Sequence, residues 1–319
     1  MSIIGSVFGA MFGGGAKPVP PPSPKVAAPS IIKARGDYSL VDEAHAKVVQ
    51  ARLIDLGYLE PPVDGKWGGS SAWALGALGS DNHERDLATT YDAGSTLPAS
   101  VQGMIADAKQ LPLHINDSEF LSQVVRGMVA TGANISRHQT CRNIVAAEGY
   151  DLSGVRNDDR RNSFNDVKMV FHLDGFGRPV LDGAFVATTT PGHRWSRQPM
   201  HPDGAFNIKP GWQKAWRLGE YHGRALRQVG MLEGYRDRER ASVRDLRYPV
   251  RGDGFGVHHH QGYNLPRDDM KNASAGCQVI RSTTDHEKFI GLALQDARYK
   301  ANHGYVFSAT VLEQEQVPK

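Results

Sequence analysis

The sequence predicts a multidomain α+β protein in which a small helical domain precedes a β-rich domain with flanking helices. The chain has 319 residues, 40% of them apolar, which is enough for two or three domains with buried cores. Apolar residues recur at helical spacing in the first part of the chain, and they alternate at strand spacing after Asn143. We divide the chain into an N-terminal segment and linker (1–35), a helical domain (36–112), connecting helices (113–135) and a β-rich domain (136–319).

The composition limits the possible partners and cofactors. The two cysteines, Cys141 and Cys277, lie far apart and do not form the framework of a disulfide-rich protein. A net charge of +3 suits an anionic polymer, but the chain lacks the clustered basic stripe and the known module of a nucleic-acid-binding domain. We therefore expect no nucleic-acid partner, and nothing in the sequence calls for a cofactor.

Residues 1–25 differ in composition from the rest of the chain. An apolar, glycine-rich stretch (1–16) precedes a proline-rich stretch (17–25). The first stretch is too short to span a bilayer, and it has no basic n-region of the kind that begins a secretion signal. Two interpretations stay open. One is a short helix whose apolar face meets a membrane or a virion protein, and the other is a flexible terminus before a stiff linker.

Residues 37–79 have the pattern of a helix, a turn and a second helix. A helical stripe ends at Gly57, a turn at Asp64-Gly65 precedes Trp67, and a second helix starts at Ser70-Ser71; the stripe consists of Val41, Val48, Val49, Leu53 and Leu56. Over about forty residues this pattern resembles the small helical peptidoglycan-binding domain. The resemblance implies that Trp67 and Asp64 bind peptidoglycan. Without it, Trp67 is a core residue and Asp64 part of an ordinary turn.

Residues 97–135 are helical in pattern. Asp117 is placed to cap a run of apolar residues from Phe120 to Val129, which ends at Gly132. His138 and Cys141 follow without a glycine turn, so we interpret this second cysteine as structural.

The β-rich domain begins with a strand at 144–147, which a surface loop at 157–166 follows. After the loop comes a hairpin of two strands, 167–173 and 180–188. Basic and aromatic residues then share a loop in which Trp195 is a candidate substrate-binding residue, and His222 is a second candidate. We further expect a short helix at 211–218 carrying Trp212 and Trp216, an exposed charged loop at 236–247, a capping box at 284–287 and a closing strand at 305–312.

The candidate active site lies between Val257 and Cys277. Cysteine attacks as the thiolate, so it needs a neighbouring base, and three consecutive histidines (258–260) precede it. In an extended segment His258 and His260 share one face and His259 takes the other. Ser274 and Gly276 form a turn that would direct backbone amides toward an oxyanion. An inert buried cysteine stays open, as does a zinc site of His258 and His260 with Cys277 or His286.

The string from Ser274 to Cys277, with His260 upstream, resembles the active-site signature of L,D-transpeptidase (YkuD-type) domains in a divergent Ser-Ala-Gly-Cys branch of phage and bacterial cell-wall proteins. Residues 201–208 are similar to that family's Thr-Pro-x-Gly-x-Phe-x-Ile strand. The resemblance implies a β-rich catalytic domain, Cys277 as nucleophile, His260 as base and peptidoglycan stem peptides as substrate.

The sequence departs from the family pattern at three positions. Ala275 stands where the family has a second histidine, Val279 stands where it has arginine, and Gln261 separates His260 from Gly262. Arg281 or Arg267 would have to hold a substrate carboxylate in place of the missing arginine.

The sequence thus predicts a peptidoglycan-active cysteine enzyme that cleaves stem-peptide bonds through an acyl-enzyme on Cys277. A binding module before a catalytic domain, without a secretion signal, is similar to a phage lysin or a virion-associated wall enzyme, so we expect hydrolysis in the periplasm or cell wall. The alternatives are crosslinking by transpeptidation, a zinc peptidase using His258 and His260, and a non-catalytic wall-binding virion protein.

Overall fold

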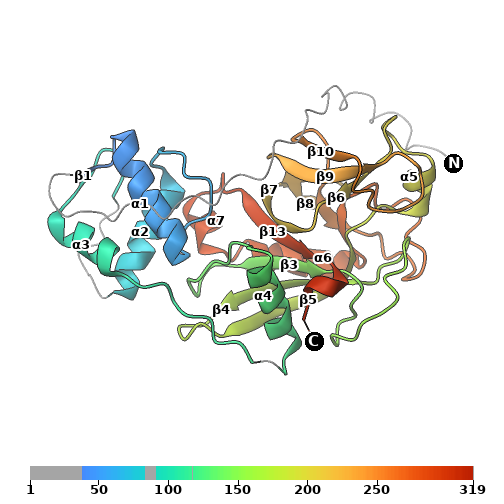
Figure 1. The fold of residues 1–319 in the computed structure, drawn as a ribbon, viewed down its shortest axis with the longest axis horizontal. Coiled ribbons are helices and arrows are strands. Elements are labelled where there is room, and N and C mark those ends of the chain that lie inside the picture. The colour runs from blue at the N-terminus through green and yellow to red at the C-terminus, as the bar shows by residue number, and fades with distance from the viewer. Residues whose placement is uncertain (1–37, 83–90, 117, 319) are drawn as a thin grey trace.

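The computed structural model describes residues 38–82, 91–116 and 118–318 (Figure 1). They form an α+β protein with a helical part and a β-rich part, as the sequence predicts. The N-terminal segment and linker (1–35) and the predicted helix cap Asp117 lie outside the described residues. None of the helices in the described part of the chain combines the length and the hydropathy that a bilayer-spanning segment requires.

The helical part packs around a single apolar core. Its elements are β1 (Tyr38–Ser39), α1 (Glu43–Leu56), α2 (Gly69–Asp81), β2 (Thr96–Leu97) and α3 (Ala99–Asp107). The core contains fully buried side chains from each of the three helices, among them Val49, Leu53, Leu56, Leu75, Leu78 and Ile105. The three helices lie together at one end of the molecule (Figure 1).

The two ends of α1 follow from local sequence. Asp42 caps the helix, because its carboxylate accepts a hydrogen bond from the backbone N–H of His45 at 2.9 Å. Gly57 ends it with a φ of 84°, in the left-handed region that favours glycine, which confirms the predicted stop. Val41 precedes the cap and is 72% exposed, so its predicted place in the apolar stripe is wrong. The second helix begins within one residue of the predicted Ser70-Ser71 start.

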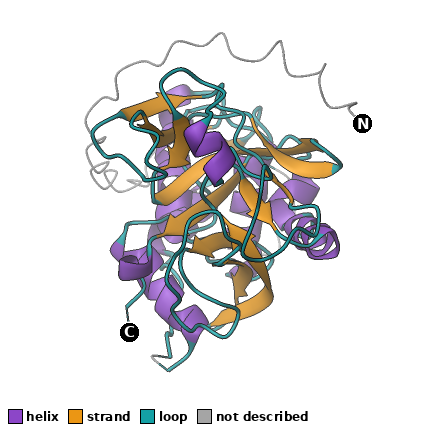
Figure 2. Cartoon of the chain, turned by 90° about the vertical axis from the view of Figure 1, so that its right-hand side faces the viewer, coloured by secondary structure: helices purple, strands orange, loops and turns teal. Residues whose placement is uncertain are grey.

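The strands of the β-rich part curl around an apolar interior (Figure 2). Eight described strands close into a barrel in the order β11-β12-β5-β4-β3-β13-β7-β8. Their bounds are β3 (Asn143–Ala147), β4 (Asp166–Leu173), β5 (Pro179–Thr188), β7 (Gly211–Glu220), β8 (Arg224–Gln228), β11 (His259–Gln261), β12 (Gln278–Ile280) and β13 (Phe307–Leu312). The antiparallel pairing of β4 with β5 confirms the predicted hairpin, whereas β11 and β12 pair in parallel.

A second sheet and several helices surround the barrel. The sheet has the order β10-β9-β6, with β6 (Ala205–Ile208), β9 (Leu232–Asp237) and β10 (Pro249–Gly252). The remaining elements are α4 (Phe120–Ala130), α5 (His193–Arg197), α6 (Thr283–Ala293), α7 (Ala297–Ala301) and the 3-10 helix η2 (Gln314–Gln316). As predicted, the α4 segment ends before Gly132, whose φ is 73°.

Two helices cover opposite faces of β4. The α4 helix packs against Val167 and Met169, while α6 packs against the core that contains Val170. Because side chains alternate along a strand, Lys168 shares the α6 face with Val170. That face is the interior of the barrel.

Several local predictions are wrong. Residues 211–218 belong to β7 and not to a helix. The prediction failed because Trp212 and Trp216 are four residues apart, and residues at this spacing share a face in a helix and in a strand. The helix after Cys277 is capped by Ser282, not by a box at 284–287. The segment with Trp195 is the short helix α5. The predicted surface loop 157–166 contains the fully buried Phe164.

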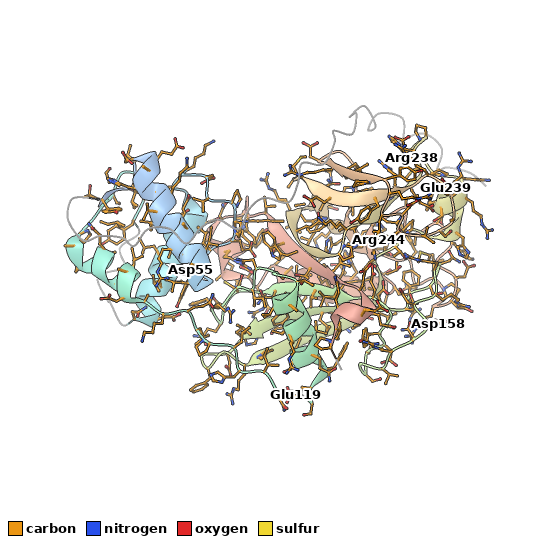
Figure 3. The ribbon with its side chains drawn as sticks, viewed as in Figure 1. Asp55, Glu119, Asp158, Arg238, Glu239 and Arg244 are labelled. Carbon is orange, nitrogen blue, oxygen red and sulfur yellow. The ribbon has the colours of Figure 1, made fainter. Side chains whose placement is uncertain are left out.

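The charged segment 236–247 is not simply an exposed loop. Arg238 and Glu239 lie at the edge of the molecule, whereas Arg244 lies inward (Figure 3). The guanidinium of Arg244 is 6% exposed and binds Glu148 at 2.6 Å and Glu313 at 2.7 Å. Two ion-pair partners offset its desolvation, which explains why so polar a segment enters the interior.

Candidate active site

The turn before Cys277 is built by Ser274 and Gly276. The Ser274 hydroxyl accepts a hydrogen bond from the Gly276 N–H at 3.1 Å and donates one to the Cys277 carbonyl at 2.9 Å. Gly276 has a φ of 127°, and a Cβ there would lie 2.5 Å from the Phe206 carbonyl oxygen. Both residues therefore fix the turn. Since the Gly276 N–H is bonded to Ser274, the expectation that it faces an oxyanion is wrong.

The Cys277 thiol is nearly buried. The residue is 7% exposed and packs in a cluster with Phe164, Met270, Ala273 and Val279. Its sulfur accepts from the backbone N–H of His258 at 3.4 Å and donates to the Gly256 carbonyl at 3.5 Å. Burial raises the pKa of Cys277 to about 11, against the opposing effect of the His258 amide. The resting sulfur is thus a protonated thiol at neutral pH, and it needs a base before it can attack.

The three histidines divide between the faces of β11 as predicted. His259 pairs with Gln278 and His260 with Val279 in the parallel register of β11 and β12. The ring of His259 points into the barrel, with its centroid 4.5 Å from that of Trp216. The rings of His258 and His260 lie on the other face, where their centroids are 4.5 and 5.2 Å from that of Tyr221. Cys277 directly precedes β12, next to His258.

The hydrogen bonds of His258 and His260 assign opposite tautomers to them. The Nδ1 atom of His260 lies 2.8 Å from the Gln261 carbonyl oxygen, which only accepts, so Nδ1 carries the proton and Nε2 has a free lone pair. The Nδ1 atom of His258 lies 3.0 Å from the backbone N–H of Gln228, which only donates. In the neutral ring Nε2 of His258 therefore carries the proton. His260 is able to accept a proton, and His258 to donate a hydrogen bond.

Both imidazoles are neutral at pH 7. Burial lowers the pKa of His258 to about 4, and the charge of Arg227 acts in the same direction. Burial also lowers the pKa of His260 to about 3, although its bond to Gln261 opposes the shift. A neutral imidazole is the form that takes a proton from a thiol.

Two predicted substrate-binding residues brace the crossover between β11 and β12 (262–277). Arg281 donates from Nη1 to the Leu265 carbonyl at 3.1 Å, and Trp195 donates from its indole N–H to the Asn272 carbonyl at 3.0 Å. Arg267 binds the Phe164 carbonyl at 3.2 Å. His222 is exposed at the turn between β7 and β8, and its ring packs against Tyr221. Of these residues His222 is the one that shares an aromatic neighbour with the two outer histidines.

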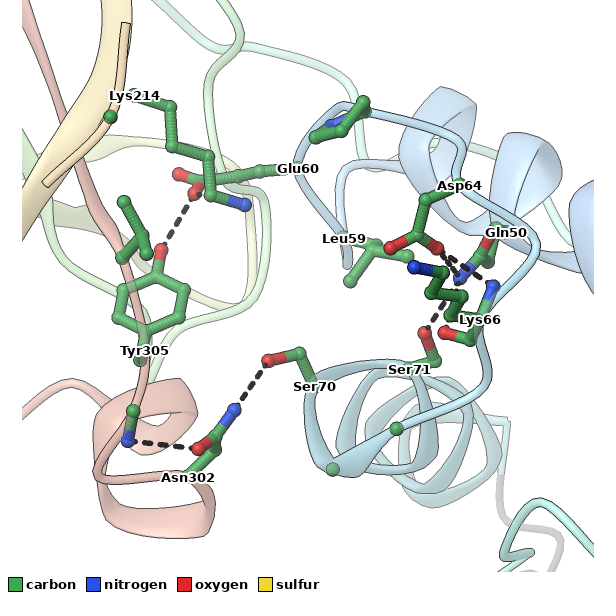
Figure 4. Close-up of a pocket in the computed structure, with 16 residues that line it drawn as sticks. Gln50, Leu59, Glu60, Asp64, Lys66, Ser70, Ser71, Lys214, Asn302 and Tyr305 are labelled. Atoms are coloured by element: carbon green, nitrogen blue, oxygen red, sulfur yellow. Dashed lines mark hydrogen bonds and ion pairs between the residues drawn. The ribbon is translucent and has the colours of Figure 1, made fainter. Parts of the chain in front are cut away.

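The two candidates in the helical part have different surroundings. Trp67 is 7% exposed within the helical core, and its indole N–H donates to the Tyr91 carbonyl at 2.8 Å. It is therefore a core residue and offers no exposed ring to a glycan. Asp64 is exposed and accepts from Gln50 at 2.9 Å. It lines a cleft of about 430 Å³ between the helical part and the barrel (Figure 4).

The residues that orient the site have no recognisable signal in the sequence. Gln228 fixes both the ring of His258 and the segment before it, since its side-chain carbonyl accepts from the Val257 N–H at 3.0 Å. Tyr221 packs on both outer histidines. Neither residue belongs to a motif, and each reaches the site only through strand pairing.

The histidines do not form part of a metal-binding group. Among the described residues, no three His, Cys, Asp or Glu side chains converge as metal ligands. The Nδ1 atoms of His258 and His260 are both engaged with the backbone, which leaves one nitrogen on each ring.

Comparisons with protein-family models, with curated proteins and with solved structures found no match. The function is therefore argued from the geometry of the site and from the resemblance of its motifs.

Proposed function

We propose that the protein is a cysteine hydrolase of peptidoglycan stem peptides, with Cys277 as nucleophile and His260 as general base. The observation that carries this proposal is the pair of opposite tautomers on the outer face of β11, next to the point where the His258 N–H contacts the Cys277 sulfur at 3.4 Å. One histidine has a free lone pair to accept the thiol proton, and the other has an N–H to donate. The choice of peptidoglycan rests on the motif resemblances at 37–79, 201–208 and 274–277.

The reaction starts from a neutral thiol and a neutral base. As the Cys277 sulfur attacks a peptide carbonyl carbon, its proton moves to Nε2 of His260. Hydrogen bonds from Nε2–H of His258 and from the Cys277 N–H would stabilise the negative oxygen. The carbon–nitrogen bond then breaks while His260 returns the proton to the leaving amine, and a thioester remains.

Water completes the reaction. His260 takes a proton from the water and the hydroxyl oxygen bonds to the acyl carbon. The carbon–sulfur bond then breaks, and His260 gives its proton to the sulfur, which restores the thiol and the neutral imidazole. An amine in place of water would give a crosslink by the same steps. We favour hydrolysis, at the cell wall, because the arrangement of the sequence is similar to that of phage lysins and virion-associated wall enzymes.

Mass spectrometry of muropeptides tests the proposal. Purified sacculi are incubated with wild-type protein, with Cys277→Ala and with Cys141→Ala, whose cysteine is buried just before β3. We expect new peptide ends with wild type and with Cys141→Ala, and none with Cys277→Ala. Equal cleavage by Cys277→Ala would overturn the assignment of the nucleophile, and new crosslinks without release would replace hydrolysis by transfer.

The near burial of the Cys277 sulfur favours a second candidate, a wall-binding virion protein without catalysis. This candidate predicts that wild type and Cys277→Ala bind sacculi equally and that neither changes a peptide bond.

A further inference from the structure

A lysine and a histidine meet inside the barrel, behind the candidate active site. Lys168 is 0% exposed and His259 is 1% exposed. The Nζ atom of Lys168 lies 3.1 Å from Nδ1 of His259. Lysine and histidine side chains are costly to bury, and neither residue has an acidic hydrogen-bond partner among the described residues. A purely structural interior would accommodate apolar side chains at these positions more easily.

The position of the pair connects it to the nucleophile. Lys168 lies on β4 and His259 on β11, and β5 and β12 lie between them in the barrel order. The lysine side chain therefore crosses the interior below the start of β12. The outer face of β11 carries His258 and His260, and Cys277 directly precedes β12. The ammonium group thus lies behind the strand pair that holds the thiol.

One group near the ammonium group of Lys168 gains a negative charge during the proposed reaction. His259 contacts it from β11, and three further groups interact with it electrostatically: Asp166 on β4, Cys277 just before β12 and His286 on α6. Asp166 accepts hydrogen bonds from the backbone N–H groups of Gly149 and Thr189 at 3.0 and 2.8 Å, and burial and the charge of Glu148 raise its pKa to about 7, so it is only partly charged at neutral pH. Both imidazoles are neutral, because burial lowers their pKa values. Cys277 is the remaining group that gains a negative charge during the proposed reaction.

We propose that Lys168, held by His259, is a positioning residue that stabilises the thiolate of Cys277 electrostatically from inside the barrel. The inference rests on the proposed function, in which this thiolate forms as His260 takes the proton. Lys168 transfers no proton and does not touch the substrate. The positive ammonium group and the negative thiolate attract each other more strongly here than in water, because little water separates them.

The ionisation of both groups agrees with this role. Burial lowers the pKa of Lys168 to about 7, while the charges of Asp166 and Cys277 oppose the decrease. The same lysine lowers the pKa of Cys277. The ammonium group is therefore partly charged near neutral pH, and formation of the thiolate increases its charge by linkage.

Alkylation of Cys277 by iodoacetamide tests the proposal without any enzyme assay. The rate is measured from pH 6 to pH 10 by mass spectrometry of the Cys277 peptide, which separates it from Cys141. Lys168→Gln removes the charge and keeps a donor for His259 Nδ1, and we expect alkylation about tenfold slower at pH 7.5, equal to about one pKa unit. Lys168→Arg, which keeps the charge, should remain within about threefold of wild type.

The control is Lys214→Gln, which removes a half-buried lysine at the contact with the helical part and should leave the alkylation profile unchanged. Should Lys168→Gln fail to fold by circular dichroism, Lys168→Met provides the same neutral comparison. Equal profiles for wild type and the neutral variant would overturn the proposal, as would an arginine variant as slow as glutamine. If Cys277→Ala cleaves sacculi normally, the proposed function fails, yet the alkylation profiles still report the coupling.

Discussion

Two buried polar regions of this protein differ in how their charges are matched. The junction region (Glu60, Lys214, Asp296, Arg298 and Tyr305) joins the helical part to the barrel. Arg298 is 2% exposed and binds Glu60 at 2.9 Å and Asp296 at 2.6 Å. The nucleophile region (Lys168, the three histidines 258–260 and Cys277) has no such pairing with a carboxylate in the described part of the chain. Burial with matched charges keeps groups ionised, whereas burial without them keeps the groups neutral.

The ionisation of single groups shows the contrast. Burial alone would raise the pKa of Glu60, but Arg298 and Lys214 outweigh it and lower the pKa to about 2. Burial raises the pKa of Cys277 to about 11 and lowers that of His260 to about 3. The junction region is therefore charged at neutral pH, whereas the thiol and the imidazoles of the nucleophile region rest in their neutral forms.

The largest expected effect concerns the two outer histidines. His260→Gln removes the lone pair that accepts the thiol proton, so we expect kcat to fall by about 10³-fold. His258→Gln keeps an amide donor near the oxyanion, and we expect a decrease of about tenfold. The measurement is the initial rate of muropeptide release by both variants at equal concentration. A larger loss for His258→Gln would reverse the two roles, provided that thermal melting shows both variants folded.

The next largest effect is on stability. Arg298→Met leaves the carboxylates of Glu60 and Asp296 buried with fewer partners, so we expect it to lower the free energy of unfolding by about 3 to 5 kcal/mol. Urea denaturation measures the change. Iodoacetamide reactivity of Cys277 should stay as in wild type, because among the described residues no hydrogen bond or ion pair joins the junction region to the nucleophile region. A loss under about 1 kcal/mol would mean that water or local movement replaces the network.

The two regions should respond to acid in different pH windows. His258 has a folded pKa of about 4, below its ordinary value of 6.5, so the unfolded chain binds more protons and stability falls as the pH drops from 6.5 to 4. The decrease is about 3 kcal/mol for this group. Glu60 has a folded pKa of about 2, so its contribution is complete above pH 4.5 and is lost as the pH falls toward 2.

Urea unfolding between pH 8 and pH 3 separates these windows. His258→Gln should make the curve less steep between pH 6.5 and 4, where the other buried histidines still contribute, and leave the decrease below pH 4 in place. If the variant and wild type have parallel curves between pH 6.5 and 4, the titration of His258 does not contribute to the pH dependence of the free energy of unfolding.

The smallest effect is at Trp67. Because its indole is buried and donates to Tyr91, Trp67→Phe should cost about 1 kcal/mol of unfolding free energy through the lost hydrogen bond. Binding to purified sacculi, measured by sedimentation, should stay unchanged. A selective loss of binding with unchanged stability would restore Trp67 as a binding residue.

Much of the local structure was predictable, because it depends on neighbours in the sequence. Gly57 ends α1, the β4–β5 hairpin forms as expected, and His259 takes the opposite face from the other two histidines. The wrong prediction at 211–218 came from a four-residue spacing that fits helices and strands equally.

The rest depends on contacts between segments far apart in the sequence. Hydrophobic periodicity does not predict the barrel order, the parallel pairing of β11 with β12 or the contact between Lys168 and His259. The proposed roles of His258 and His260 depend on the backbone N–H of Gln228 and the backbone carbonyl of Gln261. Backbone partners of this kind cannot be predicted from the residue types.

The crossover between β11 and β12 has a consequence for how specificity can change. Three of its braces bind main-chain oxygens: Arg281 reaches the Leu265 carbonyl, Trp195 reaches the Asn272 carbonyl, and the Phe164 N–H reaches the Arg267 carbonyl at 2.8 Å. Contacts of this kind do not depend on which side chains the crossover carries. Evolution or a designer can therefore replace exposed side chains at its tip, and so change the surface beside the candidate site, while the proposed nucleophile and base keep their places.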